Sequence, residues 1–81
     1  MRVVTTIPHP QFAVTVYSWN GKYLLKFEQA MLEQTYKVSE LDLNGDADIQ
    51  TIVEDADFMA HVQNTFNSMA KGIHRAVTKV I

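Results

Sequence analysis

Hydrophobic and polar residues alternate through the first half of the chain, and the most regular stretch flanks an Asn20-Gly21 dipeptide. β-type residues run from Phe12 to Trp19 before it and from Lys22 to Glu28 after it. Asn-Gly between two such runs predicts a β-hairpin, because a type I′ turn needs positive φ at both central residues. A two-residue loop also determines the pairing. The predicted pairs are Trp19–Lys22, Tyr17–Leu24, Val16–Leu25, Thr15–Lys26 and Val14–Phe27.

A third run of β-type residues, Leu32–Val38, follows a turn near Gln29-Ala30. That turn contains no glycine, so it constrains the second register less than Asn20-Gly21 constrains the first. A two-residue loop at Gln29-Ala30 predicts the pairs Lys26–Glu33, Phe27–Leu32 and Tyr23–Tyr36.

The two registers divide the side chains between two faces, since successive residues of a strand point in opposite directions. One face is almost wholly apolar and is the predicted core face: Phe12, Val14, Val16, Tyr23, Leu25, Phe27, Leu32, Tyr36 and Val38, with Ser18 and Gln34 as its polar members. The other face is mixed and rich in aromatic residues: Thr15, Tyr17, Trp19, Lys22, Leu24, Lys26, Glu28, Glu33, Thr35 and Lys37.

The period of the hydrophobic pattern becomes helical after Asp46. Asp46 is the predicted N-cap of a short helix, and Asp55 is the predicted N-cap of a longer one. In the longer helix one apolar stripe recurs at three- and four-residue steps: Phe58, Met59, Val62, Phe66, Met69, Ile73, Val77 and Val80. This stripe is what the apolar face of the sheet requires as a cover.

These elements predict an α+β fold in one domain, residues 1–81. Residues 11–39 form a three-stranded antiparallel meander, residues 46–81 are helical, and the helices cover one face of the sheet. Residues 1–10 form an arm, or a fourth strand over Val3–Ile7 at the edge of the sheet, ending where Pro8 and Pro10 forbid regular structure. The last helix would be about 36 Å long, whereas a seven-residue strand spans about 24 Å. We therefore expect the helix to extend beyond the sheet.

Composition narrows the class of protein further. The chain has no cysteine, so disulfides and thiolate metal sites are excluded. With 47% hydrophobic and 20% charged residues it is a globular chain, and no apolar run approaches the about 18 residues of a membrane span. The N-terminus lacks a long apolar core and a small-residue cleavage site, which favours a cytoplasmic location.

One acidic segment has the spacing of a metal loop. Asp42-Leu43-Asn44-Gly45-Asp46-Ala47-Asp48-Ile49 resembles the opening of an EF-hand or dockerin calcium loop, with oxygen ligands at alternate positions. Ala47 stands where the loop needs glycine, however, and Val53 stands where a bidentate carboxylate should be. A turn followed by an acidic helix N-terminus explains the same residues. The histidines and serines have no spacing that predicts a metal site or a nucleophile, so we expect no metal, no cofactor and no enzymatic activity.

The mixed sheet face offers a binding surface, because Tyr17, Trp19 and Leu24 lie among Lys22, Lys26 and Lys37. Stackable rings and positive charge suit single-stranded nucleic acid. Aromatic residues are equally enriched at protein interfaces, and Trp19 could also belong to an extended core. The net charge of −2 argues mildly against nucleic acid, and the basic row of Lys71, Arg75 and Lys79 also complements a helix C-terminus.

Two segments, Ser18-Trp19-Asn20-Gly21-Lys22-Tyr23 and Glu33-Gln34-Thr35-Tyr36-Lys37-Val38, precede an acidic turn and a helix. This arrangement resembles small bacterial proteins of unknown function over about residues 15–60, and the resemblance implies no activity. The sequence instead favours a self-associating protein-interaction module, most simply a homodimer, with a weak single-stranded nucleic-acid binder as the alternative. The interface candidates are Tyr17, Trp19, Leu24, Ile73, Val77, Val80 and Ile81, and the nucleic-acid candidates are Lys22, Lys26 and Lys37.

Overall fold

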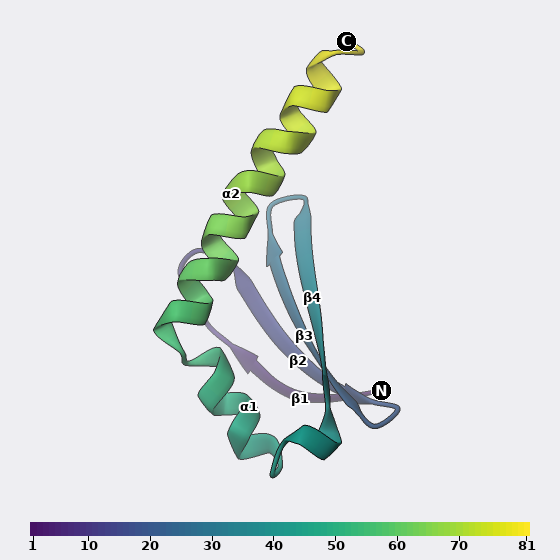
Figure 1. Ribbon diagram of the computed structural model, residues 1–81, viewed down its shortest axis with the longest axis vertical. Coiled ribbons are helices and arrows are strands. Elements are labelled where there is room, and N and C mark those ends of the chain that lie inside the picture. The colour runs from purple at the N-terminus through teal and green to yellow at the C-terminus, as the bar shows by residue number, and fades with distance from the viewer.

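The computed structural model describes the whole chain, residues 1–81. Four antiparallel strands form one sheet in the order β1-β2-β3-β4, and both helices lie against the same face of it (Figure 1). The α+β class, the meander and the long last helix are confirmed, and the N-terminal segment is a fourth, edge strand. The elements are β1 (Arg2–Ile7), β2 (Ala13–Trp19), β3 (Lys22–Gln29), β4 (Leu32–Ser39), the 3-10 turn η1 (Glu40–Asp42), α1 (Asp46–Val53) and α2 (Ala56–Thr78).

The first hairpin has the predicted register. All five predicted pairs between β2 and β3 are present, from Trp19 opposite Lys22 to Val14 opposite Phe27. Asn20 and Gly21 have φ values of 54° and 72°, as a type I′ turn requires. The Asn-Gly dipeptide therefore determined the local structure.

The predicted register of the second hairpin is wrong by two residues. The turn lies at Ala30-Met31, so Lys26 pairs with Thr35 and Phe27 pairs with Gln34. Ala30 adopts a φ of 53°, a conformation that usually selects glycine or asparagine, and this explains why the sequence did not reveal the turn. A shift of two residues leaves every side chain on its predicted face, because the side-chain period of a strand is two.

The core forms where the predicted apolar face of the sheet meets the helices. Ten apolar side chains are buried there: Phe12, Val14, Val16, Tyr23, Leu25, Phe27, Ile49, Val53, Val62 and Phe66. Gln34 is the one buried polar residue, and its Nε2 donates to the carbonyl of Val62 at 3.0 Å while its Oε1 accepts from the Tyr36 hydroxyl. These bonds offset the cost of burying an amide and join β4 to α2.

The two helices begin differently from one another. Asp55 caps α2 as predicted, since its Oδ2 accepts from the backbone N–H of Phe58 at 3.0 Å. Asp46 does not cap α1. Gly45, with a φ of 121°, occupies that position without a side-chain bond. The Asp46 carboxylate instead accepts from the Tyr23 hydroxyl at 2.7 Å and lies 3.6 Å from the Arg2 guanidinium. Asp46 thus bonds residues that are distant in the sequence instead of capping α1.

The molecule is elongated, with extents of 48 × 26 × 19 Å. Its radius of gyration is 14.5 Å, against about 12 Å for a compact chain of this length. Figure 1 shows the cause, because α2 runs past the β3–β4 turn and its last turns stand clear of the sheet. The expectation that the helix extends beyond the sheet is confirmed.

Candidate interaction surfaces

The end of α2 beyond the sheet, residues 70–81, is exposed at every position, and we call this segment the overhang. The buried part of the apolar stripe ends with Val62, Phe66 and the partly buried Met69. The same stripe continues into solvent at Ile73 and Val77, which are 54% and 42% exposed. Val80 and Ile81 at the tip are 83% and 91% exposed. The apolar stripe that covers the core therefore continues along α2 beyond the end of the core.

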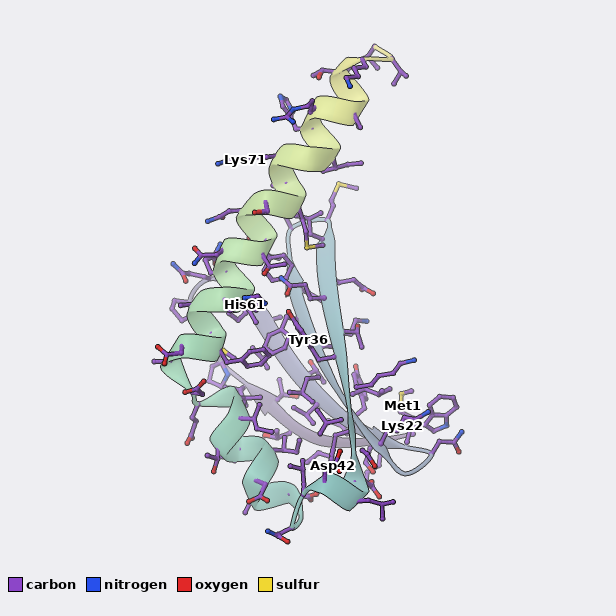
Figure 2. The ribbon with its side chains drawn as sticks, in the orientation of Figure 1. Met1, Lys22, Tyr36, Asp42, His61 and Lys71 are labelled. Carbon is purple, nitrogen blue, oxygen red and sulfur yellow. The ribbon has the colours of Figure 1, made fainter.

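The charged residues of the overhang are all basic, whereas most of the acidic residues lie in the segment between the sheet and α2. Every residue after Asp57 that carries a formal charge at neutral pH is basic: Lys71, Arg75 and Lys79. Figure 2 shows Lys71 pointing away from the sheet into solvent. The segment from Glu40 to Asp57, which forms η1, α1 and the start of α2, holds seven of the nine acidic residues and no basic one. The overhang is thus a basic amphipathic segment.

A shallow groove lies at the corner where α1 meets α2, lined by Thr51, Ile52, Glu54, Asp55 and Phe58. We call it the elbow groove. Its apolar part is Ile52 and Phe58, both partly buried against the core, and its polar part includes two exposed carboxylates. Sequence reasoning missed this groove, because its shape depends on the angle between two helices. The only signal in the sequence was the closely spaced pair of helix starts.

The outer face of the sheet carries the aromatic residues predicted for it. Val3, Tyr17, Leu24 and Lys37 are successive cross-strand neighbours on the four strands, while Trp19 lies at the end of β2 and is 48% exposed. Tyr17 and Leu24 are partly buried and line a shallow depression together with Met1. Figure 2 places Met1 and Lys22 at this end of the molecule, far from the overhang.

The predicted interface residues therefore form two separate groups. The structure brings Tyr17, Trp19 and Leu24 together on the outer face of the sheet. Ile73, Val77, Val80 and Ile81 belong to the overhang of α2, and α2 covers the opposite face. No single flat partner surface reaches both groups.

The lysines of the outer face are partly neutralised. Lys26 Nζ lies 3.6 Å from a Glu28 carboxylate oxygen and 3.7 Å from one of Glu33. The carboxylate of Glu28, and then that of Glu33, raises the pKa of the Lys26 ammonium above its ordinary value of 10.5. Lys22 and Lys37 line a polar depression that also holds Glu40. This face is a charge-balanced surface, which weakens the case for binding a phosphate backbone.

The acidic segment that resembles a calcium loop contributes to the fold. The hydroxyl of Tyr23 donates to Asp46, and this hydrogen bond, with burial of the ring, raises the pKa of Tyr23 above its ordinary value of 10.0. Asp48 accepts from the backbone N–H of Asn44 at 2.9 Å, and Glu40 accepts from the Ser18 hydroxyl at 2.7 Å. The bonds of Asp46 and Glu40 attach the start of α1 and η1 to the sheet, whereas the bond of Asp48 is local to the turn before α1.

The histidines lie apart from one another. The ring of His9 stacks on Phe12 with centroids 4.0 Å apart, and its Nδ1 accepts from the Gln11 backbone N–H. His61 stacks on Phe58, and Figure 2 shows His61 on α2 near Tyr36. No group of three or more histidine, aspartate or glutamate side chains is placed to hold a metal ion. Neither helix is both long and apolar enough to cross a membrane.

Comparisons with protein families, with curated proteins and with solved structures find no match for this chain. The surfaces of the molecule are therefore the basis for assigning a function.

Proposed function

We propose that this chain is a non-catalytic assembly module that associates with copies of itself through the overhang of α2. The observation that carries the proposal is the continuation of one apolar stripe from the buried Phe66 to the exposed Ile73 and Val77. A helix that only had to cover the sheet could end near Met69, where contact with the core stops. The stripe beyond that point stabilises the protein only if another surface covers it.

The surface area supports the same proposal. The molecule exposes 5575 Å², whereas a compact monomer of 9.2 kDa exposes about 4900 Å². Full burial of a large aliphatic side chain contributes about 1.5–3 kcal/mol. Four such side chains stand on the overhang, all partly or largely exposed: Ile73, Val77, Val80 and Ile81. Covering them would contribute several kcal/mol to association, in a small chain without a disulfide.

Val77→Asp tests the proposal, with Thr78→Asp as the matched control. Both variants place one carboxylate at neighbouring positions of the same helix end, so their effects on the helix dipole are similar. Val77 lies on the apolar stripe, whereas Thr78 is one helical step of about 100° away from it. In sedimentation at micromolar concentration we expect Val77→Asp to be shifted toward monomer and Thr78→Asp to associate like wild type. Equal behaviour of all three proteins would refute self-association through the overhang.

A further inference from the structure

We infer that the overhang of one copy docks into the elbow groove of a second copy, and that two antiparallel molecules make this contact reciprocally. The inference rests on the proposed self-association and adds the surface that receives the overhang. It follows from three features of the molecule: its charge distribution, the lining of the groove, and the length of α2.

Charge argues against two overhangs packing on one another. Pairing overhang with overhang would bring together Lys71, Arg75 and Lys79 from each copy, six cationic side chains without one acidic residue. Like charges at an interface oppose association and suppress that arrangement. The overhang requires an acidic partner surface, and this chain provides one between Glu40 and Asp57.

The elbow groove has the chemistry that an amphipathic basic helix requires. Ile52 and Phe58 provide apolar contact for residues such as Val77 and Val80, while Glu54 and Asp55 provide carboxylates beside it. Asp57, in the first turn of α2 and one residue before Phe58, adds a third exposed carboxylate. The Glu54 side chain accepts only from the exposed Gln50 amide, so it retains free lone pairs for a lysine or an arginine.

The groove that receives the overhang must belong to another molecule. Asp55 and Val77 lie at opposite ends of α2, separated by about 33 Å at 1.5 Å per residue. A continuous helix cannot fold back on its own start. The same separation allows two antiparallel copies to place each overhang beside the elbow groove of the other.

Reciprocal docking also enlarges the contact. The overhang is about 18 Å long and about 10 Å wide, so a single contact is small beside the about 800 Å² that each partner buries in a standard interface. Two contacts related by a two-fold axis double the area and close the assembly at a dimer.

An anionic membrane is the other acidic surface that suits a basic amphipathic helix. Membrane-surface helices generally carry tryptophan, phenylalanine or leucine on their apolar face. The overhang has none of these residues, and its apolar side chains are isoleucine, valine and alanine. The observations therefore favour the second copy as the occupant.

Cysteine cross-linking tests the inference directly, because the chain has no native cysteine. A Thr51→Cys protein and a Val80→Cys protein are mixed and oxidised, and Thr35→Cys on the outer sheet face replaces Thr51→Cys as the control. We expect the Thr51→Cys and Val80→Cys chains to cross-link to one another more than Val80→Cys cross-links to itself, and the control to cross-link weakly. Dominant cross-linking of Val80→Cys to itself would refute docking into the elbow groove but would still support self-association through the overhang.

Salt and charge reversal provide a second test. Docking into an acidic groove predicts that the dimer weakens as the salt concentration rises. A dimer formed by two basic overhangs would instead become stronger as the salt concentration rises. We expect Glu54→Lys to weaken dimerisation by about tenfold, since it acts in both reciprocal contacts, and Asp42→Lys on η1 to change it little. A wild-type dimer that strengthens with salt, or that is unaffected by Glu54→Lys, overturns the inference alone.

Two further outcomes complete the test. A wild-type protein that stays monomeric overturns both this inference and the proposed function. Vesicles of anionic phospholipid are offered to the wild-type protein in parallel. Capture of the protein by the vesicles, lost in Val77→Asp and accompanied by dissociation of the dimer, would show that the overhang serves a membrane and would overturn docking to a second copy.

Discussion

Val62 and Val77 carry the same side chain on the same stripe of α2, and they differ in what covers them. Val62 is fully buried against the sheet, whereas Val77 is 42% exposed on the overhang. Replacing each with alanine removes the same atoms from the same helix. The pair therefore measures how much each part of the apolar stripe stabilises the monomer.

Val62→Ala should cost about 2–3 kcal/mol. Removing two buried methyl groups accounts for about 1.6 kcal/mol, and the cavity left between Phe66 and the sheet adds the rest. The whole chain has about 4–12 kcal/mol of stability at its length, so this is a large fraction. The melting temperature should fall by about 10–20 °C.

Val77→Ala should behave differently, in a way that depends on protein concentration. At low concentration its free energy of unfolding should lie within about 0.5 kcal/mol of wild type, because alanine favours the helix more than valine does. As concentration rises, wild type should gain stability from association and the variant should gain less. Urea unfolding, followed by circular dichroism at two protein concentrations, measures both effects. A loss of stability at low concentration equal to that of Val62→Ala would show instead that the overhang packs within its own monomer.

Three further predictions concern the fold. Ala30→Gly should leave stability unchanged or raise it by about 1 kcal/mol, since relief of the left-handed conformation at φ 53° outweighs the entropy of glycine. Gly21→Ala, at φ 72°, should lower stability. Two changes of the same sign in urea unfolding would contradict this. Asp55→Ala should cost about 1 kcal/mol through loss of the cap on α2, and Asp55→Asn, which can still accept from Phe58, should cost clearly less in the same assay. Because the folded-state pKa of Tyr23 is raised above its ordinary value of 10.0, its contribution to stability is present below that pH and is lost as pH rises through the folded pKa. Asp46→Asn should therefore lower the pKa of Tyr23, measured from tyrosinate absorbance. An unchanged titration would show that the bond to Asp46 does not raise this pKa.

The sequence predicted those features that depend on local chemistry or on periodicity. Asn20-Gly21 predicted the register of the first hairpin, because only a few residues permit its turn. The second turn uses Ala30, which gives no such signal, and its predicted register was wrong while the faces were right. Because the side-chain period of a strand is two, the core residues were assigned correctly although the register of the second hairpin was wrong. The helical period of the apolar stripe predicted the extension of α2.

Features that depend on contacts between distant elements were not predictable in this way. Asp46 had the sequence context of a helix cap, but it bonds Tyr23, 23 residues earlier in the chain. Gln34 was recognised as a polar residue on the core face, but its partner, the Val62 carbonyl, became visible only in the structure. The elbow groove depends on how α1 and α2 meet, and residue spacing does not encode that angle.

We propose that a second copy of the chain covers the overhang of α2. Sedimentation equilibrium of the wild-type protein, which gives its mass as a function of concentration, tests this self-association. We expect a mass that rises from the 9.2 kDa of one chain and levels off near twice that value in the micromolar range. A mass that stays at 9.2 kDa up to the highest soluble concentration would contradict it.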